Sequence, residues 1–584
     1  MRSIRDAVSA GPNNSMSVIL RERARAQRIS ASPGPPTAAS FARWGGSRRI
    51  YAFILPALFG IFGKQIHRSF DSSSSRVAEL GLAQDDNRRA ASHSHSLLTT
   101  LAYCAALLGS IVVFPPPASA HVNSPGVYFD GYAGPYHVLV TINPPAVVPG
   151  IADIEVRSTT GDVQGIKILP LKMVGEGASV APTPDAMERT HDDATLFRGK
   201  LWIMTRGSWK VQIAIEGARG PGILYVPLPA VSTRSARMQR GLGVLLASLG
   251  LLLVAGMVGI VGAAVREAGL PAGEEPAAEL RRRSYRREAV AAVLVLAAIV
   301  FGDRWWRAEA AVNARLNYKV PHLQADLQAG NHLLLRLEEP NLPEVDRYGV
   351  ESADKLMLTD LLPDHGHLMH LFLVRMPDMN SFWHLHPEQV GAGRFALDLP
   401  SMPAGRYRLY ADILHHTGFP ETQIGEIALP DIGGTPLAGD DSGESSLAAS
   451  GAVSQLPDGY RMIWERDASS LKANVPLWFR FRIEDKEGHP AAGMENYMGM
   501  PAHAAIISAD GTVFAHVHPT GSVSMAAEML AEGAAHPMNM AAPDPPGAEV
   551  SFPYGFPRAG EYRVFVQVKR AGRIETGVFT AHVQ

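Results

Sequence analysis

The chain is almost without cysteine: Cys104 is the single one among 584 residues. One cysteine cannot form an intramolecular disulfide, and it cannot supply the paired thiolates of a C-x-x-C site. Any soft metal ion would therefore have to be bound through histidine and methionine, of which the chain has 21 and 20. The alternative interpretation of the methionines is ordinary filling of a hydrophobic core.

The chain also has no large net charge of either sign. The net charge is −2 and the pI is about 6.9, so no basic field favours nucleic acid as a partner. Apolar residues make up 46% and charged residues 19%, which suits several globular domains with some membrane-spanning chain and excludes a wholly disordered protein. No G-x-S-x-G, H-E-x-x-H or P-loop motif is present, and the acids near His191 (Glu188, Asp192 and Asp193) are interpreted as loop residues.

Targeting features occupy the N-terminal fifth of the chain. Residues 96–120 form an apolar run that follows Arg88 and Arg89 and ends in Ala-Ser-Ala, which predicts a secretory signal peptide that would carry Cys104 away on cleavage. Residues 1–95 are then a disordered N-terminal extension, interpreted as an over-extended start of the reading frame. The alternative is a genuine disordered arm with a short apolar segment at residues 50–63.

Two apolar runs, residues 241–265 and 289–302, predict a transmembrane helix hairpin over residues 239–306. Six arginines lie between Arg266 and Arg287, which places this loop in the cytoplasm. The signal peptide gives the same orientation. We therefore expect a bacterial inner-membrane protein with the rest of the mature chain on the periplasmic side.

Alternating apolar and polar residues, separated by Pro and Gly turns, predict β-strands in the exported parts. The expected fold class is mainly β, with three Ig-like antiparallel β-sandwich domains plus the two-helix hairpin. We name the sandwich regions block one (residues 121–232), block two (315–430) and block three (451–584). Residues 431–450 are rich in Gly, Ser and Asp, which predicts a flexible linker.

Blocks two and three resemble an internal repeat. "FWHLHP" (382–387) matches "FAHVHP" (514–519), and the first histidine of each lies 14 or 13 residues after an earlier one, His370 or His503. In a strand, residues i and i+2 share a face, so the two histidines of each H-x-H sequence point the same way. The Asp-Gly turn after His503 would fold the two strands of block three into a hairpin.

In block three this hairpin gathers imidazole and thioether side chains, a combination that suits copper. The expected ligands are His503, His516, His518, Met498, Met500 and Met525, with His536, Met538 and Met540 nearby. The alternative is a solvated histidine face with methionines as gap fillers.

Block two has more imidazole, and the same folding brings together His370, His384 and His386, with His365 and His367 near the entrance. Asp364 is expected as a ligand or as a group that orients an imidazole. His415 or His416 would add a further ligand, whereas Met369 is expected in the core. The alternative is a solvated loop whose histidines respond to pH. Whether blocks two and three share one ion is left open by the sequence.

In block one, cleavage after residue 120 would make His121 the mature N-terminus. Its α-amine and ring nitrogen could chelate Cu(II), with His137 or His191 as a further ligand. The alternative is that His121 only begins the first strand.

Block one resembles the YtkA-like and FixH-like family of bacterial periplasmic Ig-like domains at residues 131–157 and 201–217. The His121 chelate is similar to that of CopC-type copper-resistance sandwiches, whose mature chains begin with a ligand histidine. "DHGHLMHLFLVR" (364–375) and the histidine–methionine stretch from Glu495 to Ala526 resemble domains of bacterial copper-handling membrane proteins. These resemblances imply membrane-anchored sandwiches associated with copper tolerance or cuproenzyme assembly.

The expected function is that of a membrane-anchored periplasmic protein that binds copper. It would buffer the ion or pass it to a partner, either a membrane copper transporter or a cuproenzyme. One alternative is a copper oxidoreductase that uses His121 or the set of His370, His384 and His386. A second is a structural scaffold for a membrane complex, without a metal.

Overall fold

The computed structural model describes residues 126–174, 182–235, 238–271, 273–315, 317–340, 356–449, 451–466, 470–533 and 545–584. The expected N-terminal extension and signal peptide lie outside the described residues, as do His121, His536, Met538 and Met540. The chain forms two compact units. Of the described residues, one unit comprises those in 255–291, and the other comprises those in 126–254 and 292–584 and holds all the described strands.

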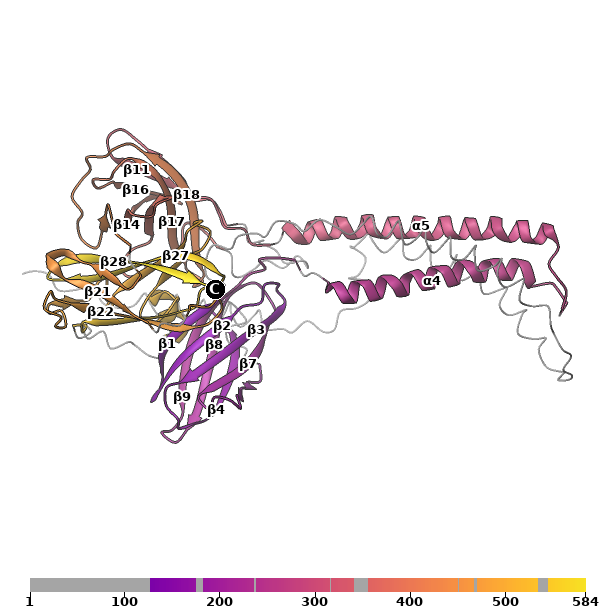
Figure 1. Ribbon diagram of the computed structural model, residues 1–584, viewed down its shortest axis with the longest axis horizontal. Helices are drawn as coiled ribbons and strands as arrows, with labels where there is room; N and C mark the ends of the chain where they lie inside the picture. Colours follow the sequence, from indigo (N-terminus) through magenta and orange to yellow (C-terminus); the bar gives the residue numbers. More distant parts are fainter. Residues whose placement is uncertain are drawn as a thin grey trace, which may run out of the picture. The chain divides into compact units, whose positions relative to one another are not determined.

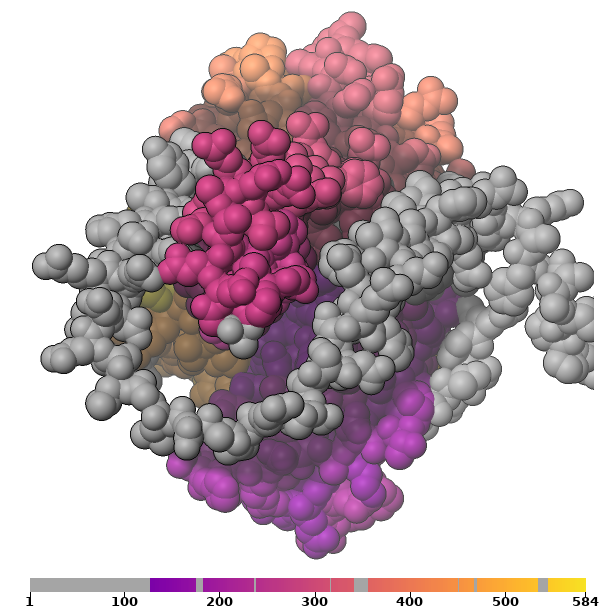
Figure 2. Space-filling model, turned by 90° about the vertical axis from the view of Figure 1, so that its right-hand side faces the viewer, coloured from indigo at the N-terminus to yellow at the C-terminus, as the bar shows by residue number. Residues whose placement is uncertain are grey.

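Two helices, α4 (Arg240–Glu267) and α5 (Ala278–Arg315), are long and apolar enough to cross a membrane. Where the loop joins them they lie side by side, and the Ser284 hydroxyl donates to the Gly262 carbonyl at 2.9 Å (Figure 2, magenta). Helix α5 continues to Arg315, beyond the expected end at residue 306.

Block one consists of two antiparallel sheets around one hydrophobic core, in the order β1-β2-β3-β7-β6 and β5-β4-β8-β9 (Figure 1). Its strands are β1 (Val127–Ala133), β2 (Tyr136–Asn143), β3 (Gly150–Ser158), β4 (Val163–Lys172), β5 (Asp185–Ala186), β6 (Glu188–Arg189), β7 (Leu196–Ile203), β8 (Gly207–Gly217) and β9 (Gly222–Ala230). Along β3 the burial alternates, which is the pattern that the sequence predicts for a sheet with one face on a core.

Block two also has two antiparallel sheets, β10-β11-β16-β15 and β12-β17-β13-β14-β19, with β18 paired to β17. The strands are β10 (Gln324–Leu327), β11 (His332–Arg336), β12 (Leu361–Leu362), β13 (His370–Met376), β14 (Phe382–Leu385), β15 (Glu388–Gly391), β16 (Arg394–Asp398), β17 (Gly405–His415), β18 (Pro420–Leu429) and β19 (Ser442–Glu444).

Block three repeats this arrangement with sheets β20-β21-β22-β26 and β23-β27-β24-β25, the latter with β28 paired to β27. The elements are β20 (Val453–Gln455), η2 (Pro457–Gly459), β21 (Arg461–Glu465), β22 (Leu477–Glu484), β23 (Met494–Glu495), β24 (His503–Ser508), β25 (Phe514–Val517), α6 (Met525–Glu532), β26 (Glu549–Tyr554), β27 (Gly560–Arg570) and β28 (Arg573–Val583). The structure is thus mainly antiparallel β with two long apolar helices, as expected.

The sheets that carry the histidines are buried on both faces. In β13, Leu371 and Leu373 point into the core of block two, whereas Phe372 and Val374 belong to a cluster shared with block three. Strand β24 likewise turns Ile507 toward this shared cluster. Because side chains alternate along a strand, His370 lies on the shared face with Phe372. We call this contact between the two sheets the shared face.

Residues 431–449 do not form the flexible linker that their composition predicts. Ile432 is buried and forms a bridge with Met402, and β19 adds to the sheet beside β14, with Ser442 opposite His384. Backbone hydrogen bonds and the buried side chain of Ile432 hold this segment against block two. Its Gly, Ser and Asp residues therefore form turns and not a flexible connection.

Block one contacts the loop that follows His518. Phe129 forms a bridge with Gly521, and the Asp130 carboxylate accepts from the Trp478 indole at 2.6 Å. Gly521 has φ +130°, and a Cβ there would lie 1.9 Å from the Tyr128 carbonyl oxygen, so only glycine fits this approach. Block one therefore holds in place the loop next to one of the candidate metal ligands.

Candidate metal centre

The shared face brings together the histidines that the sequence singles out in both blocks. They form one continuous cluster of ring contacts: His365, His367, His370, His384, His386, His503, His516 and His518. All except His367 are largely buried. The expected hairpins form, because Leu371 pairs with Leu385 and Ala504 with Val517.

The same tight turn precedes the first strand histidine in each block. His365 and Gly366 have φ of +52° and +87°, and Met498 and Gly499 have φ of +51° and +80°. Positive φ at both central residues is typical of a type I′ turn, in which glycine relieves the strain at the second position. Asp364 and His367 exchange backbone hydrogen bonds across the first turn, as Tyr497 and Met500 do across the second.

Three histidines from two blocks form the first group of possible ligands, which we call group one: His365, His503 and His518. Their ligand atoms lie within 4.8 Å of one another. The His365 Nδ1–H donates to the Met498 carbonyl at 2.9 Å, and the His518 Nδ1–H donates to the Val523 carbonyl at 3.1 Å. A carbonyl oxygen can only accept, so the tautomer of both neutral rings is fixed with the lone pair on Nε2.

Those two Nε2 atoms face each other at 3.3 Å. Neither can donate when both rings are neutral, so the contact places two lone pairs against each other. Two nitrogen ligands at about 2.0–2.1 Å from a tetrahedral ion are themselves about 3.3 Å apart. The spacing therefore fits an ion held between His365 and His518, with His503 as the third ligand.

His370, His384 and His386 form the second set, group two, and all three come from block two. The His386 Nδ1–H donates to the Asp441 carboxylate at 3.0 Å, which fixes the lone pair on Nε2. Among the described residues this buried Nε2 has no hydrogen-bond partner. A carboxylate behind an imidazole whose other nitrogen is unused is the usual support of a metal-bound histidine.

Two close pairs of histidines connect the two blocks reciprocally. His370 Nε2 lies 3.2 Å from the Asp364 carbonyl and its Nδ1 lies 3.0 Å from His384, whose own Nδ1 lies 3.0 Å from Gln567 of block three.

His503 repeats the pattern, with its Nε2 at 3.1 Å from the Tyr497 carbonyl and its Nδ1 at 3.3 Å from His516. The Nδ1 of His516 lies 3.2 Å from Asp412 of block two. In each block, therefore, the second histidine of the pair contacts a side chain of the other block.

Burial keeps these rings neutral. Desolvation, followed by the charge of neighbouring histidines, lowers the pKa of His370, His384, His503 and His516 well below its usual value, and desolvation lowers the pKa of His518 to about 4. Desolvation also raises the pKa of Asp412 to about 7, with a further contribution from Asp364. Neutral imidazole is the form that binds a metal, so the ligands are prepared for an ion at neutral pH.

The other expected ligands lie in different positions. Met498 and Met500 are buried in the second turn, where Met498 replaces His365 and Met500 replaces His367. Met525 begins α6 and is half-buried. Met369 is in the core of block two, as expected.

Four further candidate histidines belong to neither group. His415 contacts the Met357 carbonyl and Glu421, and His416 pairs with Asp360 at 2.5 Å. In block one, His137 pairs with Asp130 at 2.6 Å, and His191 is exposed in a loop. These histidines therefore have local partners or lie in solvent.

Four residues that support the cluster were not expected from the sequence. Asp440 and Asp441 come from the presumed linker, and Asp412 and Gln567 lie opposite His370 and His503 in the sheet register. A signal for the last two was present, because each follows the Gly of a Gly-x-Tyr sequence by seven residues and so occupies the same position in the repeat.

Comparison with known proteins finds a family model that matches part of the chain, and it names no activity. The family described as "Domain of unknown function (DUF8832)" matches residues 340–423 and 454–584, which include all eight clustered histidines. No curated protein matches the chain.

Similar solved structures include a tetra-tandem repeat from the extending region of a large adhesion protein, at 7% identity with a TM-score of 0.13, covering 75% of this chain and 71% of that one. Another is the native conformation of E. coli alpha-2-macroglobulin, at 9% identity with a TM-score of 0.18, covering 79% of this chain and 23% of that one.

Proposed function

We propose that the protein is a membrane-anchored metal-binding protein that holds copper between blocks two and three, and that buffers it or passes it to a partner. The observation that carries this proposal is the pair of Nε2 atoms of His365 and His518, which face each other at 3.3 Å with both Nδ1 atoms engaged by carbonyls. A neutral pair in this arrangement is unfavourable without a cation.

The choice of copper rests on the donor types. The clustered side chains are imidazoles, and thioethers replace two of them in the second turn, whereas the described residues contain no cysteine. Imidazole binds both oxidation states of copper and thioether favours Cu(I), whereas structural zinc more often recruits thiolate.

The proposed location is a bacterial inner membrane, with α4 and α5 as the anchor and three Ig-like sandwiches on the periplasmic side. The six arginines between Arg266 and Arg287 support a cytoplasmic loop. A periplasmic partner, either a membrane copper transporter or a cuproenzyme, would receive the ion.

The test is metal stoichiometry on the full-length chain in detergent, loaded separately with Cu(I), Cu(II) and Zn(II). We expect tight uptake of Cu(I), one ion lost in His365→Ala and the other in His386→Ala, each with an affinity loss of about 100-fold or more at its own site. His137→Ala is the matched control, because that ring lies in block one and pairs with Asp130.

Equal uptake by the parent and by the double variant His365→Ala/His386→Ala would refute metal binding by this cluster. Block three in isolation would be an unsuitable substitute for the full chain, because it lacks His365.

A further inference from the structure

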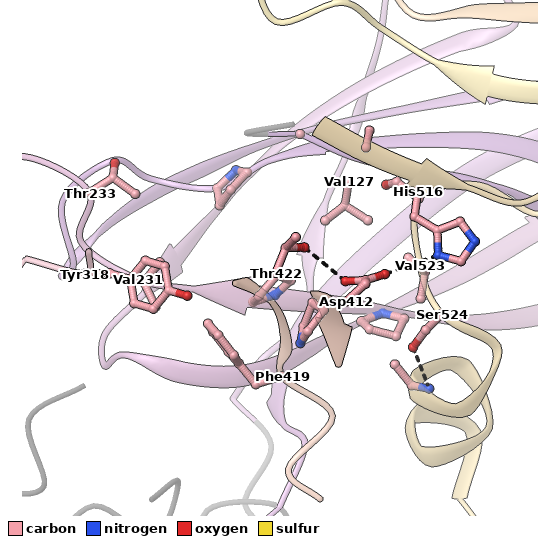
Figure 3. A pocket seen from close by; sticks show the side chains of 18 of the residues that line it. Val127, Val231, Thr233, Tyr318, Asp412, Phe419, Thr422, His516, Val523 and Ser524 are labelled. Atoms are coloured by element: carbon pink, nitrogen blue, oxygen red, sulfur yellow. Dashed lines mark hydrogen bonds and ion pairs between the residues drawn. The ribbon is translucent and has the colours of Figure 1, made fainter. Parts of the chain in front are cut away.

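A cavity of about 690 Å³ lies where the three blocks meet (Figure 3). Most of its lining is apolar, including Val127, Val231, Phe419 and Val523. One part is different: Figure 3 shows Asp412 between Thr422 and His516, and His518 also lines the cavity. The cavity therefore reaches the histidine cluster from the side of block three.

Asp412 is the polar group through which the cavity meets the cluster. Its side chain is 25% exposed, whereas that of His516 is 3% exposed. Its carboxyl group accepts from Thr422 at 3.0 Å and lies 3.2 Å from His516 Nδ1. The Asp412 oxygens are therefore possible ligands for a cation at the point where the cavity meets His516.

Another part of the cavity wall is formed by the chain segments that lead to the two apolar helices. Thr233 and Arg234 precede the start of α4 at Arg240, and Tyr318 follows the end of α5 at Arg315. The Tyr318 N–H donates to the Ser232 carbonyl at 2.7 Å, so the two segments are tied together at this wall. The cavity thus adjoins the residues at which the chain leaves for the proposed membrane anchor and returns from it.

The cluster has a second contact with solvent, in block two. The side chains of His367 and Asp440 are 29% and 33% exposed and lie 3.4 Å apart. The His367 ring stacks on His386 at 3.9 Å between centroids. This end also carries carboxylates, from Asp440 and Asp441.

Between these two ends the imidazoles form an unbroken series. The ring centroids of His386 and His370 are 5.0 Å apart, those of His370 and His516 are 5.3 Å apart, and those of His516 and His518 are 4.5 Å apart. An ion that exchanges one imidazole for the next along this series is never without a ligand, so no step requires a bare ion in a buried site.

We propose that the eight histidines form a two-ended path for a soft monovalent cation, with one opening at His367 and Asp440 and the other in the cavity at Asp412. This proposal rests on the proposed function and deepens it: the ion would be taken up at one end and released at the other, beside the membrane anchor. The transfer is an exchange of ligands, without any change in oxidation state.

The experiment measures the rates of Cu(I) uptake and of Cu(I) release to a competing chelator, using the full chain in detergent. Val231→Trp and Thr233→Trp each add a large ring to the cavity wall, at positions that Figure 3 shows across the cavity from His516. Ile223→Trp is the control, because that side chain is 53% exposed and does not line the cavity. We expect both cavity variants to keep the parental affinity and to exchange roughly tenfold more slowly once the second opening is also weakened by Asp440→Asn.

Parental exchange rates in both cavity variants combined with Asp440→Asn would overturn the path. A parent chain that takes up no Cu(I) would instead refute the proposed function, so the two failures are distinguishable. If one tryptophan variant loses Cu(I) affinity as well as exchange rate, the second tryptophan variant decides the outcome. Loss of Cu(I) affinity in both variants would also overturn the proposal.

Discussion

Blocks two and three present the same design with different side chains. Both have a tight turn with two positive φ values, a strand histidine bonded to the carbonyl before that turn, and a second histidine on the paired strand. At equivalent positions block two has His365 and Asp412, where block three has Met498 and Gln567. The backbone is duplicated, whereas the donor atoms are not.

This difference separates the two candidate groups. Group two is complete within block two, with Asp441 from the segment that follows β18 as its support. Group one needs His365 from block two in addition to His503 and His518 of block three. One group thus depends on the contact between the blocks and the other does not, and three perturbations test this distinction, beginning with the largest expected effect.

Lowering the pH should reduce the stability of blocks two and three together. The pKa of seven clustered histidines is lowered in the folded protein by desolvation: His365, His370, His384, His386, His503, His516 and His518. Between the usual pKa of 6.5 and the folded value, the unfolded chain binds more protons than the folded protein, so stability falls as the pH falls.

For His518, whose pKa is lowered to about 4, this loss is about 3 kcal/mol across that window. Denaturant midpoints of the metal-free chain at pH 6.5, 5.5 and 4.5 measure it, and His518→Gln should give a shallower dependence. A midpoint that does not change over this window would contradict the burial of the rings.

The two aromatic pairs of the shared face should contribute equally to the free energy of unfolding. Phe382 of block two stacks on Phe565 at 4.3 Å, and Phe514 of block three stacks on Tyr410 at 4.4 Å. Phe382→Ala and Phe514→Ala should each cost about 3–5 kcal/mol of unfolding free energy, because each removes a fully buried ring from the same contact. Urea unfolding measures both, and a large cost for only one of them would show that the contact is not reciprocal.

The smallest effect should appear at the support of group two. In Asp441→Asn, the amide oxygen can still accept from His386 Nδ1 but carries no charge, so affinity at this group should fall by about tenfold. Group one, whose rings are held by backbone carbonyls, should be unaffected. Chelator competition measures the two sites, with His365→Ala used to isolate group two. An equal loss at both groups would indicate that they form one site.

The sequence supports much of this arrangement because the relevant signals are local. Alternation predicts the strands, Asp-Gly predicts the hairpin after His503, and the two-residue period places His516 and His518 on one face. The uncharged run of residues 241–265 predicts α4. Each of these features depends on residues that are close together in the sequence.

The sequence does not reveal the packing of one histidine face on the other, because that contact joins residues more than a hundred positions apart. A signal existed in the strand compositions: Phe372, Val374 and Phe514 lie on the same face as the histidines, and a strand that is apolar on both faces is buried on both. Composition predicts a linker at Asp440 and Asp441 for a related reason, since it does not show that Ile432 and Ser442 pair with block two.

The reciprocal bonds from His384 to Gln567 and from His516 to Asp412 have an evolutionary consequence. A single block of this type would leave its histidine pair without a last partner, unless a second copy faced it across a two-fold axis. Joining two such copies in one polypeptide removes the requirement that they be identical. One copy can then keep an ionisable Asp where the other has a neutral Gln, an asymmetry that no homodimer could acquire by a single substitution.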